Sequence, residues 1–375
     1  MKKYISIIMI LSFIKASIAA DIYTISGATI HTVGPLGTIL GGTITIKNGK
    51  IESIGEGHSI NANEVHIDAT NKIITPGIFS PIGQLGLSEV SGVSETNDAI
   101  QTGEKFSAQF DISKAFNPRS TVIAINRSDG ITYAGITPQP RGEKSHVISG
   151  LGSTIHLGID QNSIISNGPM LIASLGETGS DIAGGSRAAA VQILEEALTN
   201  AKDSLDDKDN DNNKNKNLEI FQDIILGNRS LMINVHRASD ISIVINLKNK
   251  FDINLVIAGA AEAWMLAEEL ALSDISVILD AVNNLPGDFD SINARSNSAQ
   301  ILLEAGVTVA FGAGAQTHNA RLITQSAGNA VANNVSWNQA LESITLSPAK
   351  IWGVDKNIGS LEIGKDATFV IWNSD

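Results

Sequence analysis

The 375-residue sequence contains no cysteine. Disulfide bonds, thiol catalysis and a lipid anchor on cysteine are therefore excluded for this chain. The sequence also lacks a glycine-rich phosphate-binding loop and the Gly-x-Ser-x-Gly turn of many serine hydrolases. Histidine is scarce, with seven residues in the chain. These absences remove thiol, phosphate-loop and serine-elbow chemistry from the functions considered.

Basic residues are too few to balance the acidic ones. Lys and Arg total 26 against 39 Asp and Glu, which gives a formal net charge of −13. A chain this acidic is a poor candidate for binding nucleic-acid phosphates or anionic membranes. Apolar residues make up 43% of the chain and charged residues 17%, an ordinary globular composition. A chain of this length predicts one large domain with a smaller one.

The amino terminus has the pattern of a secretory signal peptide. Lys2 and Lys3 precede an apolar run at 5–14, and small residues follow up to Ala20. An apolar run of ten residues is too short to span a bilayer. We predict that residues 1–20 are a signal peptide. The mature protein would then be periplasmic or secreted, without further membrane association.

Two kinds of hydrophobic pattern follow the predicted signal peptide. Residues 43–47 alternate with period two and lead through Asn48-Gly49 into 50–55, which predicts a β-hairpin. Beyond Pro76, apolar runs of strand length alternate with helical patterns. Eight strands are predicted, near 74–80, 131–137, 146–157, 170–173, 231–236, 254–259, 277–281 and 308–312. Strand–helix alternation predicts parallel pairing in an α/β (β/α)₈ TIM-like barrel, with the active site at the carboxyl ends of the strands.

The predicted domain organisation has three parts after the signal peptide. Residues 21–75 and 356–375 are expected to form a small composite β-sandwich, and residues 76–355 the barrel. Within the barrel, 202–217 contains one apolar side chain, Leu205, and is expected to be a disordered insert. The strand predicted near the carboxyl terminus would leave a sheet edge open to another chain, so a homo-oligomer is one expectation.

Several segments resemble the amidohydrolase superfamily, in the order in which the family has them. Residues 73–86 resemble the end of the first barrel strand, usually Pro-Gly-Leu-Ile-Asp-x-His-x-His. Similar matches occur at the fifth, sixth and eighth strands and the closing helix, at 235–241, 255–263, 309–314 and 340–366. The resemblance covers the chain from about residue 21 onward and is nearest to an imidazolonepropionase-like exported branch. It implies hydrolysis of non-peptide C–N bonds, for example in cyclic amides, with one or two divalent metals.

The resemblance also shows that most metal-ligand positions are substituted. The family positions fall on Ile82, Gln84, Asn234, His236, Gly259 and Gly314, and of these only His236 keeps the family residue. A specific metal site needs three or four ligands, so no cofactor is expected. Zinc remains the alternative, if His318 and either Asp280 or Glu262 joined His236.

Two functions remain open at this stage. In one, the protein is a hydrolase that uses His236 as catalytic base in a minimal or metal-free site. In the other, it is a non-catalytic pseudoenzyme that binds a small polar or anionic ligand or a protein partner. The predicted ligand-binding residues follow the strands and are Gln84, Arg237, Glu262, Asp280, His318 and Arg321. The two arginines suit a carboxylate, or they pair with Asp240, Glu262 or Asp280 in salt bridges.

Overall fold

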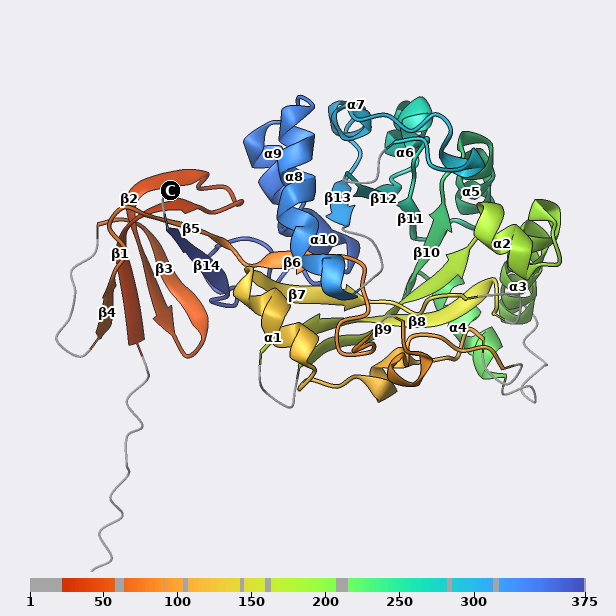
Figure 1. The fold of residues 1–375 in the computed structure, drawn as a ribbon, viewed down its shortest axis with the longest axis horizontal. Coiled ribbons are helices and arrows are strands. Elements are labelled where there is room, and N and C mark those ends of the chain that lie inside the picture. Colours follow the sequence, from red (N-terminus) through yellow and green to blue (C-terminus); the bar gives the residue numbers. More distant parts are fainter. Residues whose placement is uncertain are drawn as a thin grey trace, which may run out of the picture.

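The computed structural model describes residues 22–57, 64–90, 92–103, 107–141, 145–158, 163–206, 215–281, 285–312 and 317–373, without the side chains of 317–319. The chain forms a six-stranded sheet beside a larger eight-stranded sheet with helices around it (Figure 1). The predicted signal peptide lies outside the described residues. Among the residues that are described, no helix combines the length and apolar character needed to cross a membrane.

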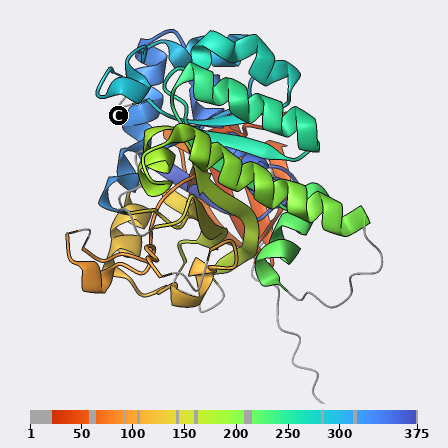
Figure 2. The same ribbon diagram turned by 90° about the vertical axis from the view of Figure 1, so that its right-hand side faces the viewer.

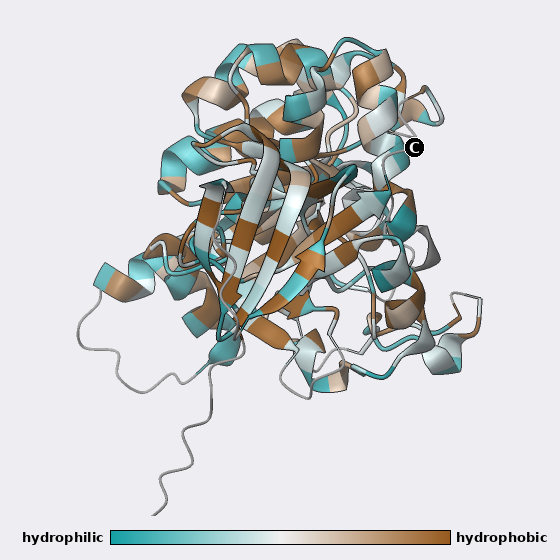
Figure 3. Cartoon of the chain, turned by 90° about the vertical axis from the view of Figure 1, so that its left-hand side faces the viewer, coloured by the Kyte–Doolittle hydropathy of each residue, from teal (hydrophilic) through white to brown (hydrophobic). Residues whose placement is uncertain are grey.

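The smaller sheet combines strands from both ends of the chain. Its strands are β1 Ile22–His31, β2 Thr38–Lys47, β3 Lys50–Glu56, β4 Val65–Asp68, β5 Lys72–Pro76 and β14 Phe369–Asn373. β2 pairs with β3 in antiparallel fashion, and Asn48 and Gly49 both have positive φ, as the predicted hairpin turn requires. Hydrophobic and polar residues alternate along these strands in Figure 3. β14 pairs with β5, so the last described strand completes a sheet begun at residue 22.

The larger sheet is a nearly closed TIM-like barrel, which confirms the predicted fold class. Its strands are β6 Ile78–Ser80, β7 Ile131–Ile136, β8 Ile148–His156, β9 Ile164–Ser174, β10 Ser230–Val235, β11 Leu255–Gly259, β12 Ser276–Asp280 and β13 Val309–Gly312. They pair in chain order from β6 to β13. The predicted strand at 74–80 is divided, because its first half belongs to β5 of the smaller sheet and its second half to β6.

One strand of the barrel runs against the prediction of uniform parallel pairing. β8 is antiparallel to both β7 and β9. Antiparallel neighbours can be joined by short connections, whereas parallel neighbours need a crossover of a dozen or more residues. The structure has no helix in the described parts of the β7–β8 and β8–β9 connections. The strand–helix alternation is therefore complete only from β9 onward.

The helices cover the outside of the barrel. They are α1 Thr121–Ser128, α2 Gly176–Ile182, α3 Arg187–Asp206, α4 Lys216–Ile225, α5 Ala238–Phe251, α6 Ala267–Leu272, α7 Ser298–Glu304, α8 Ile323–Ala332, α9 Trp337–Glu342 and α10 Leu346–Ile351. α3 buries Ala190, Leu194 and Leu198, four residues apart and thus on one face. Figure 2 shows α3 and α5 side by side, and the Lys250–Glu195 ion pair of 2.6 Å joins them.

The predicted insert at 202–217 is partly helical, which corrects its boundaries. α3 continues to Asp206, and α4 begins at Lys216 with Asn215 as its cap, the Asn215 side chain accepting a hydrogen bond from the backbone of Asn217. The buried face of α3 extends to Ala201, so the last turn continues a helix that is already anchored. Residues 207–214, the centre of the predicted insert, lie outside the described residues.

Candidate functional site

A cavity of about 320 Å³ opens at the carboxyl ends of the barrel strands. We call it the strand-end cavity. Its lining comes from the ends of β9 to β13, from the segments after β6 and β7, and from α2 and the 285–297 segment. The lining residues are Ile82, Thr137, Pro138, Gln139, Pro140, Ser174, Leu175, Thr178, Asn234, His236, Gly259, Ile278, Asp280, Asp290 and Gly312. The location is the end of the barrel where the sequence predicted a site.

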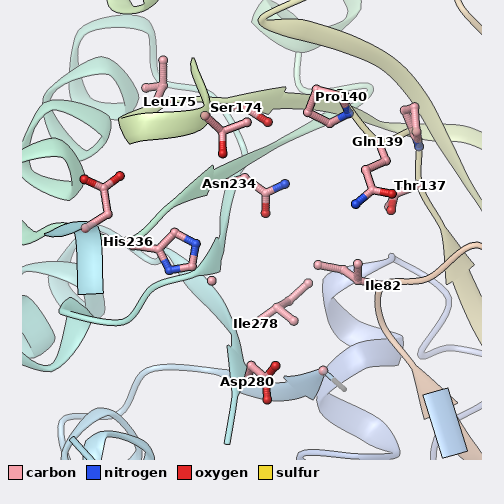
Figure 4. A pocket seen from close by; sticks show the side chains of 15 residues that line it. Ile82, Thr137, Gln139, Pro140, Ser174, Leu175, Asn234, His236, Ile278 and Asp280 are labelled. Atoms are coloured by element: carbon pink, nitrogen blue, oxygen red, sulfur yellow. The ribbon is translucent and has the colours of Figure 1, made fainter. Parts of the chain in front are cut away.

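Amide and hydroxyl groups form much of the polar lining. Figure 4 shows Ser174, Asn234 and His236 facing Gln139 and Ile82 across the cavity, with Asp280 below them. The Ser174 side chain is fully buried, and its Oγ has no hydrogen-bond partner among the described residues. Gln139 is held in place by a hydrogen bond from the side-chain amide of Gln84. The cavity therefore contains a buried hydroxyl and two side-chain amides that can donate and accept hydrogen bonds.

The His236 imidazole lies directly against Gly259. A Cβ atom built on Gly259 would be 2.5 Å from His236 Cε1, a distance that real Cβ contacts do not reach. Gly259 also has φ +86°, a conformation that favours glycine. The last residue of β11 therefore has no room for a side chain while the His236 ring keeps this position.

A second cavity of about 430 Å³ adjoins the first and shares His236, Gly259 and Asp280 with it. We call it the loop cavity, because much of its remaining lining comes from residues 285–298 between β12 and α7. His236 thus faces both spaces. A ligand longer than one cavity would pass beside the imidazole to enter the other.

Two aspartates and one arginine form a charged cluster at the rim of the strand-end cavity. Asp290 accepts hydrogen bonds from the backbone N–H of Glu177 at 2.6 Å and from Arg187 Nη2 at 2.5 Å. Arg187 Nε also lies 3.4 Å from Asp240 Oδ2. Burial raises the pKa of the Asp240 carboxyl, and the charge of Arg187 opposes that rise. The hydrogen bond to Asp290 raises the pKa of Arg187.

The sequence-predicted site residues do not all meet in these cavities. His236 and Asp280 line both of them. Gln84 is buried and donates a hydrogen bond to the side chain of Gln139, which lines the strand-end cavity. The side chain of His318 lies outside the described residues. The remaining three predicted residues, Glu262, Arg237 and Arg321, are not among the described residues that line either cavity.

Glu262 is a structural residue. Its carboxylate is 3% exposed and accepts hydrogen bonds from the backbone N–H of Ala238 at 2.8 Å and from the backbone and side chain of Asn293 at 3.2 and 2.9 Å. These bonds tie the start of α5 to the 285–297 segment. Because its oxygens face protein donors, Glu262 is absent from the described lining of either cavity.

Arg237 and Arg321 are exposed and are not among the described residues that line either cavity. Arg237 precedes α5, where its backbone accepts the first helical hydrogen bonds. Asp240 is one predicted salt-bridge partner of Arg237 or Arg321, but it forms its ion pair with Arg187. Arg237 thus follows the end of β10 closely and Arg321 lies in the segment after β13, but neither is among the described residues that line a cavity.

Comparisons with known proteins agree with the fold and the strand-end motifs. The model of the amidohydrolase family matches residues 229–375, which include β10 to β14. The family model and the relatives below support membership of the amidohydrolase superfamily. Amidohydrolase tasK of Hapsidospora irregularis is 23% identical over 88% of this chain, and the chain spans 38% of the length of that relative.

Solved structures show the same architecture. A crystal structure of an amidohydrolase from Thermotoga maritima MSB8 superposes with a TM-score of 0.86 at 22% identity, covering 94% of both chains. A prolidase complexed with N-methylphosphonate-L-proline superposes with a TM-score of 0.56 at 14% identity, covering 94% of this chain and 93% of the other. At these identities the likeness concerns the fold.

Two of the superfamily's metal positions carry no metal-binding side chain among the described residues of this chain. Ile82 presents a hydrocarbon side chain to the cavity, and Gly259 has no side chain. Gly314 lies outside the described residues. Within the described parts of the chain, no group of three or more His, Asp or Glu residues converges as a metal site would require. The chemistry proposed below therefore includes no metal-bound step.

Sequence reasoning missed Ser174, Gln139, Arg187 and Asp290. Ser174 had a usable signal, because it directly follows the strand predicted near 170–173 and pairs with Asn234 of the neighbouring strand β10. Arg187 and Asp290 had none. They are separated by about a hundred residues of sequence and meet because α3 and the 285–297 segment approach each other above the barrel.

Proposed function

We propose that this amidohydrolase-family protein binds a small amide-bearing molecule in the strand-end cavity, without a tightly held catalytic metal. The observation that supports this most strongly is the fully buried Ser174 hydroxyl, which has no hydrogen-bond partner among the described residues. A buried polar group without a partner costs about 1–3 kcal/mol. Ser174 lines the strand-end cavity, so a small shift of its side chain would let a ligand carbonyl or N–H remove that cost.

The rest of the lining favours an amide over an anion. Asn234 and Gln139 each present both a donor and an acceptor, which matches the two halves of an amide group. The acids Asp280 and Asp290 also line the cavity, whereas Lys and Arg are absent from its described lining. A ligand with N–H groups therefore suits the strand-end cavity better than a free anion does, since like charges repel in a partly buried space.

A hydrolase is the second candidate function, and the position of His236 favours it. The imidazole lines the cavity together with Asp280, so it can take a proton from a water molecule beside a bound amide. Hydrolysis of a C–N bond other than a peptide bond would follow the superfamily. In that case His236 is the general base and Ser174 or Asn234 positions the carbonyl.

We also propose that the protein is exported to the periplasm or the medium. This proposal rests on the charged start, the short apolar run and the small residues of 1–20.

A compound screen with a cavity-blocking variant tests the binding proposal. Hydantoins, N-acylated amides and dipeptides would be screened by thermal shift, and hits measured by calorimetry. Among the described residues, a Cβ on Gly312 meets Ile278 Cγ2 at 3.5 Å, an ordinary contact distance, so Gly312→Val is expected to fill cavity space without a clash at Cβ. We expect binding to be lost in Gly312→Val and kept in the control Gly55→Ala, whose added Cβ meets nothing within 4 Å. A screen in which no compound stabilises the wild type would refute the proposal.

The same hits separate the two candidate functions. Each would be incubated with wild type and with His236→Gln, and product formation followed by mass spectrometry. Binding without turnover supports a non-catalytic protein. Turnover that disappears in His236→Gln while affinity persists supports the hydrolase.

A further inference from the structure

The loop cavity contains the guanidinium group of Arg295, which is held in position and keeps unused hydrogen-bond donors. The Arg295 guanidinium carbon lies 4.6 Å from the ring centre of Trp264, and Arg295 Nε donates to the Asn297 side chain at 2.5 Å. Trp264 is itself fixed, because its Nε1 donates to the Asn293 carbonyl at 2.9 Å. Neither terminal nitrogen of Arg295 has a hydrogen bond or ion pair with another described residue.

A second unused donor lies in the same cavity. Ser298 is 1% exposed and lines the loop cavity, yet its Oγ has no hydrogen-bond partner in the described part of the chain. A buried hydroxyl of this kind normally finds an acceptor. Arg295 therefore presents a planar pair of N–H donors to the loop cavity. The Ser298 hydroxyl lies buried at the cavity wall and adds an O–H donor after a small shift of its side chain, and together the donors match a carboxylate.

The described lining of the loop cavity contains two acids, Asp280 and Asp288, beside Arg295. Asp288 accepts a hydrogen bond from the Ser291 hydroxyl at 2.6 Å, which closes the turn at the start of the 285–297 segment. Asp280 belongs to the part shared with the strand-end cavity, next to His236. The negative charge of Asp280 thus lies at the junction of the two cavities, while Arg295 belongs to the loop cavity alone.

We propose that the loop cavity is a carboxylate subsite, in which Arg295 and Ser298 hold the carboxylate of a ligand whose amide occupies the strand-end cavity. The inference rests on the proposed function for the position of the amide. It narrows the ligand class to N-acylated amino acids and similar molecules, with an amide at one end and a carboxylate at the other. His236 lies beside the link between the two ends, because it lines both cavities.

A matched pair of probes tests the subsite. N-acetylglycine and N-acetylglycinamide share the amide and differ by carboxylate against carboxamide. In calorimetric titrations of the wild type we expect N-acetylglycine to bind at least about tenfold more tightly, as charge-assisted hydrogen bonds predict. Arg295→Gln should abolish this preference and leave the affinity for N-acetylglycinamide unchanged. Arg295→Lys should keep part of it, because a lysine retains the charge and loses the planar fork.

Two further variants complete the set. Ser298→Ala should reduce the preference for the carboxylate by a few-fold. Arg119→Gln is the matched control, since Arg119 is an exposed arginine outside both cavities and should retain the full preference. Because Arg295 is itself exposed, its substitution is expected to leave the melting temperature nearly unchanged.

An independent measurement separates failure of the subsite from failure of the proposed function. Phenylglyoxal modifies accessible arginines, and peptide mass mapping would follow Arg295 with and without malonate. Protection of Arg295 by malonate without binding of either glycine probe would support the subsite and overturn the proposed function. Equal binding of both probes in wild type and Arg295→Gln would overturn the subsite alone. Neither binding nor protection would overturn both.

Discussion

The His236 imidazole and the Gly259 backbone occupy adjoining space so closely that a single methyl group on residue 259 would clash with the ring at 2.5 Å. In the superfamily pattern both positions carry histidine. In this chain the surviving ring takes the space in which a side chain from the end of β11 would begin. A side chain at residue 259 and the present position of the His236 ring are therefore mutually exclusive.

Gly259→Ala is expected to destabilise the protein by more than the about 1–2 kcal/mol that a left-handed conformation costs an alanine. The destabilisation beyond the backbone cost comes from contact between the new methyl group and His236. It should therefore be smaller when Gly259→Ala is made in the His236→Ala background, where the cost of the left-handed backbone remains. Unfolding measurements on the four proteins of this double-mutant cycle give the coupling directly. Strict additivity of the two substitutions would contradict the contact.

The two aspartates beside Arg187 should respond in opposite ways to replacement by asparagine. Asp290→Asn is expected to cost about 1–2 kcal/mol, because Asp290 is 4% exposed and loses its charged bond with the half-exposed Arg187. Asp240→Asn should be neutral or stabilising at pH 7, because burial penalises the ionised Asp240 and its Oδ2 has no hydrogen bond among the described residues. Thermal unfolding of both variants at pH 7 compares them.

The pH dependence of Asp240→Asn has a defined sign. The folded protein binds the Asp240 proton more tightly than the unfolded chain does, because the folded pKa is raised above the ordinary 3.8. The wild-type protein therefore loses folding stability as the pH rises from about 3.8, the pKa of an unperturbed aspartate, through the raised pKa of Asp240 in the folded state. Asp240→Asn cannot titrate at this position and does not lose that stability. The melting temperature of Asp240→Asn relative to wild type should increase across this window. A difference that is flat or falls with pH would show that the pKa of Asp240 is not raised.

Glu262→Ala is expected to loosen the 285–297 segment. The substitution leaves the N–H groups of Ala238 and Asn293 without their acceptor, at a cost of about 2–4 kcal/mol. Limited proteolysis should then cut within 285–297 faster than in wild type. Glu268→Ala, on the exposed surface of α6, is the control and should cut at the wild-type rate. Unchanged proteolysis of Glu262→Ala would return Glu262 to the list of ligand-binding candidates.

The purified protein is expected to carry well under one tightly bound zinc or equivalent ion per chain. The superfamily positions offer Ile82, Gln84 and Gly259, and a lone His236 binds a metal weakly. Elemental analysis after dialysis against a chelator measures this. Stoichiometric metal would refute the prediction, and substitution of His236 and His318 would then show whether they are ligands.

Export predicts that the mature chain begins after Ala19 or Ala20. Amino-terminal sequencing of protein recovered from its native host checks the cleavage. A mature chain that still begins at Met1 would refute the proposal that the protein is exported with cleavage.

Much of the barrel could be predicted from the sequence, because the responsible signals are local. The Asn48-Gly49 turn sets the β2–β3 hairpin through backbone conformations that few residue pairs adopt readily. The buried strands β10 to β13 are short apolar runs followed by amphipathic helices, and both features act within about ten residues. His236 was found by the same means, since its place after β10 follows from the motif around it.

The reversal of β8 and the true environment of the cavities could not be predicted this way. β8 is an apolar run like its neighbours, and its direction depends on the connections that join it to β7 and β9. Arg237 follows β10 and Arg295 lies in the long segment between β12 and α7; both are exposed, yet of the two only Arg295 is among the described residues that line a cavity. The difference arises because Glu262 and Trp264 hold the 285–297 segment over the barrel mouth. Hydrophobic periodicity and local conformational propensity determine where strands and helices form. Long-range hydrogen bonds between loops determine which charged side chains line the cavities.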